Sequence, residues 1–287
     1  MRLNRTTRIV TGPDRGEEER RRWLRPLDGQ GSGSRSASGS ASGSGQRIRL
    51  VCFPHAGGAA GSFRPFAPLL PGGVDLLAVQ YPGRHDRTGE PCATRMEELA
   101  GPLAAALAPV SGDGLVLLGH SMGAAVAAEV AARLEEHTGR PLLRLFVSGR
   151  PAPGTRDPVS VHEGGDEALL ADLRRLGGTD EALFSDPALR SLVLPSLRAD
   201  YRLIETYRPA EGRRLRTPLT ALTGDSDPEV TPEEAQAWRS RSSGPFRLHV
   251  FPGGHFYLLE RPVAVLGAVL ADLGRGAPAG LEWPSTP

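Results

Sequence analysis

Lysine is absent from this sequence of 287 residues, so all 34 basic residues are arginine. Against 33 acidic residues they leave a formal net charge of only +1, which gives little reason to expect a nucleic-acid partner. No stretch approaches the roughly 18 consecutive apolar residues of a membrane-spanning helix. The arginines at 20–22 resemble a twin-arginine export signal, but no apolar segment follows them. These absences favour a cytoplasmic protein that binds neither nucleic acid nor a membrane.

Cysteine is equally scarce, since Cys52 and Cys92 are the only two in the chain. Two thiols without framework spacing indicate neither a disulfide scaffold nor a metal site. We therefore expect no metal ion, and we also expect no bound cofactor.

The composition divides the chain into one folded region with a tail at each end. Residues 29–45 are almost wholly Gly, Ser and Ala, and the residues before them mix glutamates and arginines without apolar periodicity. We expect residues 1–46 to be disordered and residues 274–287, rich in Gly and Pro, to be flexible. The region 47–273 is then a single domain.

A strand-turn-helix motif carries the strongest chemical signal in that domain. The pentapeptide Gly-His-Ser-Met-Gly at 119–123 lies between an apolar run and the alanine-rich stretch 124–134. A strand that turns sharply into a helix leaves no room for side chains at positions 119 and 123, which favours glycine there. The turn lifts the hydroxyl of Ser121 above the sheet edge, so we interpret Ser121 as a catalytic nucleophile.

A serine nucleophile needs a histidine base and a carboxylate that orients the base. In folds that carry the serine on a strand-turn-helix of this kind, the three residues follow in the chain order serine, acid, histidine. Asp225 and Asp227 both follow a predicted strand at 217–224. We choose Asp227 because it lies further past the strand, and Asp225 remains the alternative. His255 follows the predicted strand at 247–251 and is the predicted base.

Two backbone N–H groups are expected to bind the oxyanion. One belongs to Met122, directly after the serine at the start of a helix, where partial positive charge favours an anion. The other belongs to Ala56, in the loop after the predicted strand 49–53. His55, beside Ala56, is interpreted as shaping this loop, and His120 as packing beneath the turn.

These segments predict an α/β fold with a mostly parallel central sheet flanked by helices. The 105 residues between Ser121 and Asp227 exceed what the sheet requires, and 157–212 lacks obvious strands. We therefore expect an inserted helical lid within 157–212. Its predicted helices are 167–176, 180–184 and one or two over 187–207, broken near Pro195.

Five motifs within residues 47–273 follow one another in the same order as in one protein family. They are Phe53-Pro54-His55-Ala56-Gly57-Gly58, Gln80-Tyr81-Pro82-Gly83-Arg84, Gly119-His120-Ser121-Met122-Gly123, Gly224-Asp225-Ser226-Asp227 and Gly253-Gly254-His255-Phe256. Together they resemble the type II thioesterases of polyketide and nonribosomal peptide synthesis, of the α/β-hydrolase superfamily. The resemblance implies hydrolysis of aberrant or misprimed acyl groups from the phosphopantetheine arms of carrier proteins.

The residues alone leave several functions open. A triad performs acyl transfer from an activated carbonyl, so a general carboxylesterase and an acyltransferase are alternatives. A noncatalytic carrier-protein binder with the same fold is a third.

We expect a monomer whose partners are acyl or peptidyl carrier proteins. Arginines near the active edge are hypothesised to meet an acidic carrier protein, because complementary charge speeds encounter: Arg84, Arg87, Arg150 and Arg156.

Overall fold

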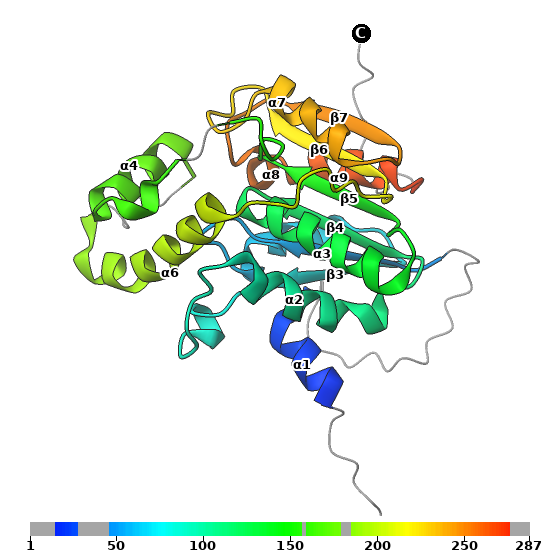
Figure 1. The fold of residues 1–287 in the computed structure, drawn as a ribbon, viewed down its shortest axis with the longest axis horizontal. Helices are drawn as coiled ribbons and strands as arrows, with labels where there is room; N and C mark the ends of the chain where they lie inside the picture. Colours follow the sequence, from blue (N-terminus) through cyan, green and yellow to red (C-terminus); the bar gives the residue numbers. More distant parts are fainter. Residues whose placement is uncertain (1–14, 28–45, 157–158, 179–184, 276–287) are drawn as a thin grey trace, which may run out of the picture.

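A seven-stranded sheet forms the centre of the computed structural model, which describes residues 15–27, 46–156, 159–178 and 185–275. The strand order is β1-β3-β2-β4-β5-β6-β7, and only β1 runs antiparallel to its neighbour (Figure 1). The predicted mostly parallel sheet is therefore confirmed. The strands are β1 (Leu24–Pro26), β2 (Ile48–Phe53), β3 (Val74–Val79), β4 (Leu115–His120), β5 (Arg144–Ser148), β6 (Leu219–Gly224) and β7 (Phe246–Phe251).

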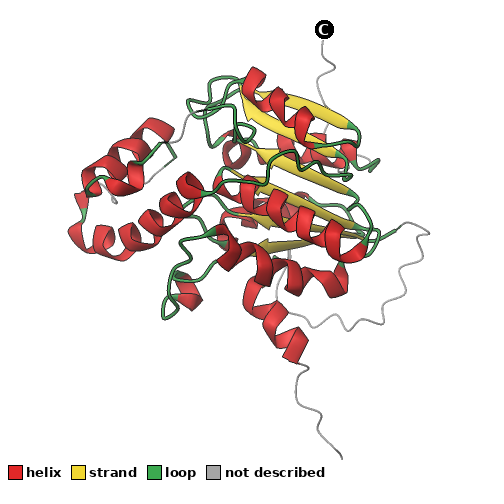
Figure 2. Cartoon of the chain, viewed as in Figure 1, coloured by secondary structure: helices red, strands yellow, loops and turns green. Residues whose placement is uncertain are grey.

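Helices cover both faces of the sheet (Figure 2). On one face α2 (Met96–Leu107) and α3 (Met122–Thr138) pack against a core that includes Val51, Leu117 and Leu145. On the other, η1 (Ala60–Leu69), α8 (Tyr257–Glu260) and α9 (Pro262–Asp272) pack against alternate residues of the same strands. All residues of β4 are buried, as expected for a strand covered on both faces.

The shorter elements connect these layers. They are η2 (His85–Arg87), η3 (Ala108–Val110), η4 (Val161–Glu163), α7 (Pro232–Gln236) and η5 (Ala237–Arg241). Across the described segments, none of the helices combines the length and apolar character that crossing a membrane requires.

The N-terminal segment differs from the disordered tail expected for residues 1–46. Helix α1 (Arg15–Trp23) and strand β1 are formed, and β1 pairs with β3 from Leu24↔Val79 to Pro26↔Leu77. Trp23 and Leu24 are buried, and their apolar contacts attach this segment to the domain although the residues around them are mostly charged. The expectation was wrong for residues 15–27, whereas residues 1–14 and 28–45 lie outside the described residues.

Between β5 and β6, the residues that the structure describes form an insert built mainly from two α-helices. Helices α4 (Asp166–Leu176) and α6 (Pro187–Thr206) pack on each other through a separate cluster that includes Leu170, Leu173 and Leu197. Figure 1 shows both helices projecting beyond one edge of the sheet. The predicted helix at 180–184 lies outside the described residues, as do most of the C-terminal residues 274–287.

Helix α6 runs through Pro195 without the predicted break. Proline removes one backbone donor and disfavours a helix interior. Burial of Leu194 and Leu197 against α4 offsets that cost, since tertiary packing stabilises most protein helices. The first turn of α6 is capped by Asp186, whose carboxylate accepts from the N–H of Ala188 at 2.8 Å.

Candidate active site

Ser121 lies in a strained turn between β4 and α3. Its backbone angles are φ 55° and ψ −120°, a conformation that residues other than glycine rarely adopt. Both flanking glycines are required by space: a Cβ at Gly119 would lie 2.1 Å from the carbonyl oxygen of Gly123, and one at Gly123 2.1 Å from that of Phe53. The Ser121 N–H donates to Ser148 O at 2.8 Å, which fixes the turn to β5.

His255 and Asp227 meet at the same edge of the sheet. Asp227 follows β6 and His255 follows β7, so parallel strands deliver both residues to one end. Nδ1 of His255 lies 3.0 Å from each carboxylate oxygen of Asp227, and both side chains are almost fully buried. The N–H of Glu229 donates to Asp227 Oδ1 at 2.8 Å, which holds the carboxylate in place.

Asp225, the alternative acid, has a different set of contacts. Its Oδ1 accepts from the N–H of Gly253 at 3.0 Å and from the Ser226 hydroxyl at 2.9 Å. These bonds lower the pKa of Asp225, which is exposed to solvent. The structure therefore brings Asp227, and not Asp225, to His255, and uses Asp225 to join the β6 and β7 loops.

His120 packs beneath the turn, as expected. Its Nδ1 lies 3.0 Å from Ser148 Oγ, which in turn lies 2.6 Å from the hydroxyl of Tyr257. The ring centroids of His120 and His255 are 4.9 Å apart. Full burial holds the pKa of His120 well below its usual range, so a neutral ring supports His255. Sequence reasoning missed Ser148 and Tyr257, for which no local pattern gives a signal.

The loop at residues 54–58, between β2 and η1, faces Ser121. Its His55 ring packs against Phe256, with centroids 5.0 Å apart, and burial together with nearby His255 and Arg84 lowers the His55 pKa to about 4. A neutral ring in van der Waals contact agrees with the interpretation that His55 shapes the loop.

The two expected oxyanion donors lie beside this arrangement. Ala56 and Met122 both line the cavity that contains Ser121. Within the described part of the chain, neither backbone N–H has a hydrogen-bond acceptor. Met122 is the first residue of α3, where N–H groups lack intrahelical partners. Both groups are therefore free to donate to a ligand.

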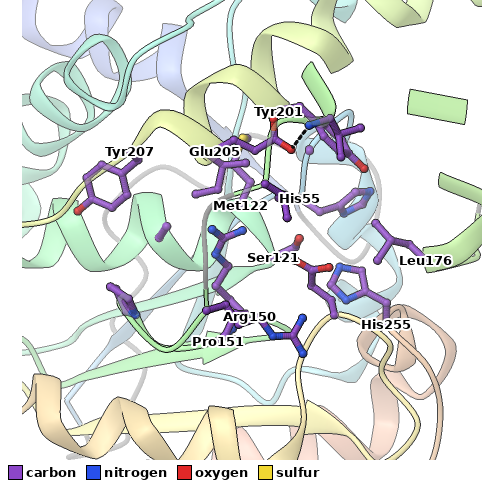
Figure 3. A pocket seen from close by; sticks show the side chains of 18 of the residues that line it. His55, Ser121, Met122, Arg150, Pro151, Leu176, Tyr201, Glu205, Tyr207 and His255 are labelled. Atoms are coloured by element: carbon purple, nitrogen blue, oxygen red, sulfur yellow. Dashed lines mark hydrogen bonds between the residues drawn. The ribbon is translucent and has the colours of Figure 1, made fainter. Parts of the chain in front are cut away.

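A cavity of about 570 Å³ connects these groups. Figure 3 shows Ser121 and His255 close together, with His55, Arg150 and Tyr201 around them. Its walls come from the catalytic edge of the sheet and from the insert, through residues such as Leu173, Leu176, Tyr201, Ile204 and Glu205. The insert thus covers the cavity, in the position expected of a lid.

Most arginines near the cavity are already paired. Arg156 bonds to Glu234, and Arg175 bonds to Asp172 and Glu229 at 2.7 Å each. Among the described residues the Arg150 side chain has no hydrogen bond or ion pair, and burial lowers its pKa. Arg150 therefore presents free donors to the cavity.

The hypothesis that four arginines meet a partner needs correction for two of them. Arg84 is buried against Asp200, with bonds of 2.6 and 2.7 Å. Arg87 is also buried: it bonds to Glu90, and its guanidinium lies 4.3 Å from the Trp23 ring. Both charges are neutralised inside the protein and are unavailable to a partner's surface.

The described residues contain no group of three His, Cys, Asp or Glu side chains arranged to hold a metal ion.

Comparison with known proteins identifies the family. Residues 48–273 match the thioesterase domain family. The chain is 46% identical over 234 residues to thioesterase PikA5 of Streptomyces venezuelae, which covers 80% of this chain and 83% of that protein. It is 44% identical over 234 residues to a probable cadicidin biosynthesis thioesterase of Streptomyces griseus, covering 81% of this chain but only 64% of the relative.

A solved structure agrees with the sequence comparison. The type II thioesterase BorB from the borrelidin biosynthetic cluster superimposes with a TM-score of 0.73 at 41% identity, over 93% of this chain and 100% of BorB. The chain belongs to the thioesterase family, and its similarity in sequence and fold groups it with the type II thioesterases, which are serine hydrolases acting on thioesters.

Proposed function

We propose that this thioesterase removes aberrant or misprimed acyl groups from the phosphopantetheine arms of carrier proteins in polyketide or nonribosomal peptide synthesis. In this proposal Ser121 is the nucleophile, His255 the general base, and Asp227 the residue that orients the base. The observation that carries it is the pairing of His255 with Asp227 beside the cavity that contains Ser121.

In the acylation step His255 takes the proton of the Ser121 hydroxyl as its oxygen attacks the thioester carbon. Asp227 accepts from Nδ1, which leaves Nε2 free to receive that proton, and the carboxylate stabilises the imidazolium that forms. The negative oxygen of the tetrahedral intermediate accepts hydrogen bonds from the N–H groups of Ala56 and Met122. The pantetheine thiol then leaves with the proton from His255, and an acyl-Ser121 ester remains.

In the second step a water molecule attacks this ester while His255 removes its proton. A second tetrahedral intermediate forms in the same oxyanion site and collapses, returning the proton to Ser121 and releasing a carboxylic acid. A single chain supplies every protein group used in these two reaction steps, so we propose that the monomer is the active form.

Two observations support a thioester on a carrier arm as the substrate. Two of the relatives described above are named for cadicidin and borrelidin biosynthesis, and another similar structure, YbtT, is described as a type II thioesterase from the yersiniabactin NRPS/PKS pathway. The cavity reaches Ser121 from beneath the α4–α6 insert and contains the free donors of Arg150, which suit the carbonyl oxygens of an extended acyl-pantetheine chain.

A comparison of two substrate classes tests the proposal. Carrier proteins loaded with acetyl, propionyl or longer acyl groups are incubated with the enzyme, in parallel with nitrophenyl esters of the same acids, and intact mass reports the loss of acyl groups. The proposal requires faster hydrolysis of the carrier-bound thioesters. Cleavage of the esters with inert carrier proteins identifies a general carboxylesterase, and transfer of the acyl group to an added alcohol or amine identifies an acyltransferase.

A further inference from the structure

A buried ion pair joins the helical insert to the loop that contains Ala56. Arg84 follows β3 and Asp200 lies in α6, yet their side chains are only 7% and 2% exposed. Two bonds connect them, from Nη1 to Oδ2 at 2.6 Å and from Nη2 to Oδ1 at 2.7 Å. A bidentate pair of this kind fixes direction as well as distance.

Both partners also bond to the backbone of the 54–58 loop. Asp200 Oδ2 accepts from the N–H of Gly57 at 2.7 Å, and Arg84 Nη1 donates to the carbonyl of Gly58 at 3.2 Å. Gly57 has φ +76°, and a Cβ there would lie 3.0 Å from Leu197 Cδ1 of α6. The two residues that follow Ala56 are therefore held between the ion pair and the insert.

Neighbours of Arg84 extend this attachment to both ends of the loop. The Tyr81 hydroxyl donates to the carbonyl of Pro54 at 3.3 Å, and the guanidinium of Arg84 lies 5.5 Å from the Tyr81 ring. Gln80 accepts from the N–H of Ala60 at 3.2 Å and donates to the carbonyl of Arg84 at 3.4 Å. The segment 80–84 thus holds the loop at several points, and Asp200 supplies the contact from the insert.

Stability alone does not explain this pair. Burying two charges has a large desolvation cost, and well-packed apolar residues often stabilise a fold as well as a buried ion pair does. Apolar side chains, however, cannot bond to the N–H of Gly57 or the carbonyl of Gly58. The directional bonds to the loop are the feature that only the charged residues provide.

We infer that Arg84 and Asp200 are positioning residues, which aim the Ala56 N–H at the developing oxyanion and make the oxyanion site depend on the seating of α6. The inference rests on the proposed function, because the Ala56 N–H matters only if Ser121 forms a tetrahedral intermediate. Displacing a reacting group by about 1 Å costs on the order of 100-fold in rate. A loosened loop should therefore impair catalysis more than substrate binding.

The test compares the single variant Asp200→Asn with a double variant that carries both Arg84→Met and Asp200→Leu. Asparagine keeps one acceptor for Gly57 but loses the charge, whereas the double variant removes both charges and leaves an apolar pair. We expect kcat on an acyl-carrier substrate to fall at least about tenfold in Asp200→Asn and about 100-fold in the double variant. KM should change less than about threefold in both, and the rate at which a fluorophosphonate labels Ser121 should fall in parallel with kcat.

Arg144→Met provides the matched control. Arg144 is another largely buried arginine, bonded to Thr220 at 2.9 Å. It is the first residue of β5, however, and so lies at the amino end of the parallel strands, whereas Ser121 lies at their carboxyl end. Arg144→Met should lower the melting temperature while kcat stays within about twofold of the wild type. A folded double variant with wild-type kcat and labelling rate overturns the inference, as does a fall in kcat in Arg144→Met equal to that in the double variant.

Failure of this inference differs from failure of the proposed function. If the proposed function is wrong, the wild-type enzyme itself leaves acyl-carrier substrates intact. If only the inference is wrong, the wild type is active, Ser121→Ala is inactive, and the folded double variant keeps the wild-type kcat.

Discussion

Both carboxylate oxygens of Asp227 lie 3.0 Å from Nδ1 of His255, although the two residues are 28 positions apart in the sequence. Each side chain is almost completely buried, so solvent does not weaken the interaction. The contact fixes the ring so that its other nitrogen is available to a substrate or nucleophile.

The choice of acid predicts unequal effects of two similar substitutions. Asp227→Asn removes the charge that orients His255 and should lower kcat by a factor of up to about 10⁴. Asp225→Asn alters only the bonds to Gly253 and Ser226, so kcat should fall less than about tenfold. Steady-state hydrolysis of an acyl-carrier substrate measures both, and a larger loss in Asp225→Asn would reverse the assignment.

The turn around Ser121 predicts that the glycines beside it are intolerant of substitution. Gly123→Ala places a Cβ against the backbone of β2, 2.1 Å from Phe53 O, and should destabilise the fold by about 2 kcal/mol or more. Gly112→Ala is the control, because no atom lies within 4 Å of its Cβ position. Urea denaturation of both variants makes the comparison, and equal stability contradicts the prediction.

Two buried imidazoles predict how stability depends on pH. Burial lowers the pKa of His55 to about 4 and that of His120 well below its usual range, whereas both titrate near 6.5 in an unfolded chain. The unfolded chain therefore binds more protons below pH 6.5, and stability is lost as the pH falls from about 6.5 toward 4.

Substitution of one imidazole checks the source of that loss. His120→Asn should reduce the slope of unfolding free energy against pH between 4 and 6.5, even if it lowers stability at pH 7. His137→Asn, at an exposed position on α3, should leave the slope as in the wild type. An unchanged slope in His120→Asn contradicts this explanation.

The N-terminal helix and strand predict a stabilising role for Trp23. Its ring is buried and packs against Arg87, so Trp23→Ala should destabilise the protein by about 3 kcal/mol. Glu18→Ala, an exposed change on the same helix, should have little effect. Thermal unfolding distinguishes the two, and similar melting temperatures would mean that this segment does not contribute to the fold.

The parts of the fold that sequence predicts are those with local signals. The turn at Ser121 needs two glycines at fixed positions, and the strand before it is a continuous apolar run, so both are visible in a few residues. The ends of parallel strands meet at one edge, which is why Asp227 and His255 were predicted near Ser121 although they lie far along the chain.

The parts that sequence did not predict depend on contacts between distant segments. Strand β1 has three residues in a charged stretch, and it is held in place by the burial of Trp23 and Leu24, which the surrounding sequence does not indicate. The pairing of Arg84 with Asp200 spans 116 residues, so the sequence suggested an exposed charge where the structure has a buried one. The helix through Pro195 persists because α4 packs against it, which no local propensity reports.

Detection of the acyl-Ser121 intermediate itself tests the proposed mechanism most directly. The enzyme is mixed with an acyl-loaded carrier protein, quenched with acid within milliseconds, digested, and analysed by mass spectrometry. An acyl group is expected on the peptide that contains Ser121. It should be absent from Ser121→Ala, which should also leave the carrier acylated. Loss of the acyl group from the carrier by Ser121→Ala at the wild-type rate, without modification of residue 121, would contradict the proposed mechanism.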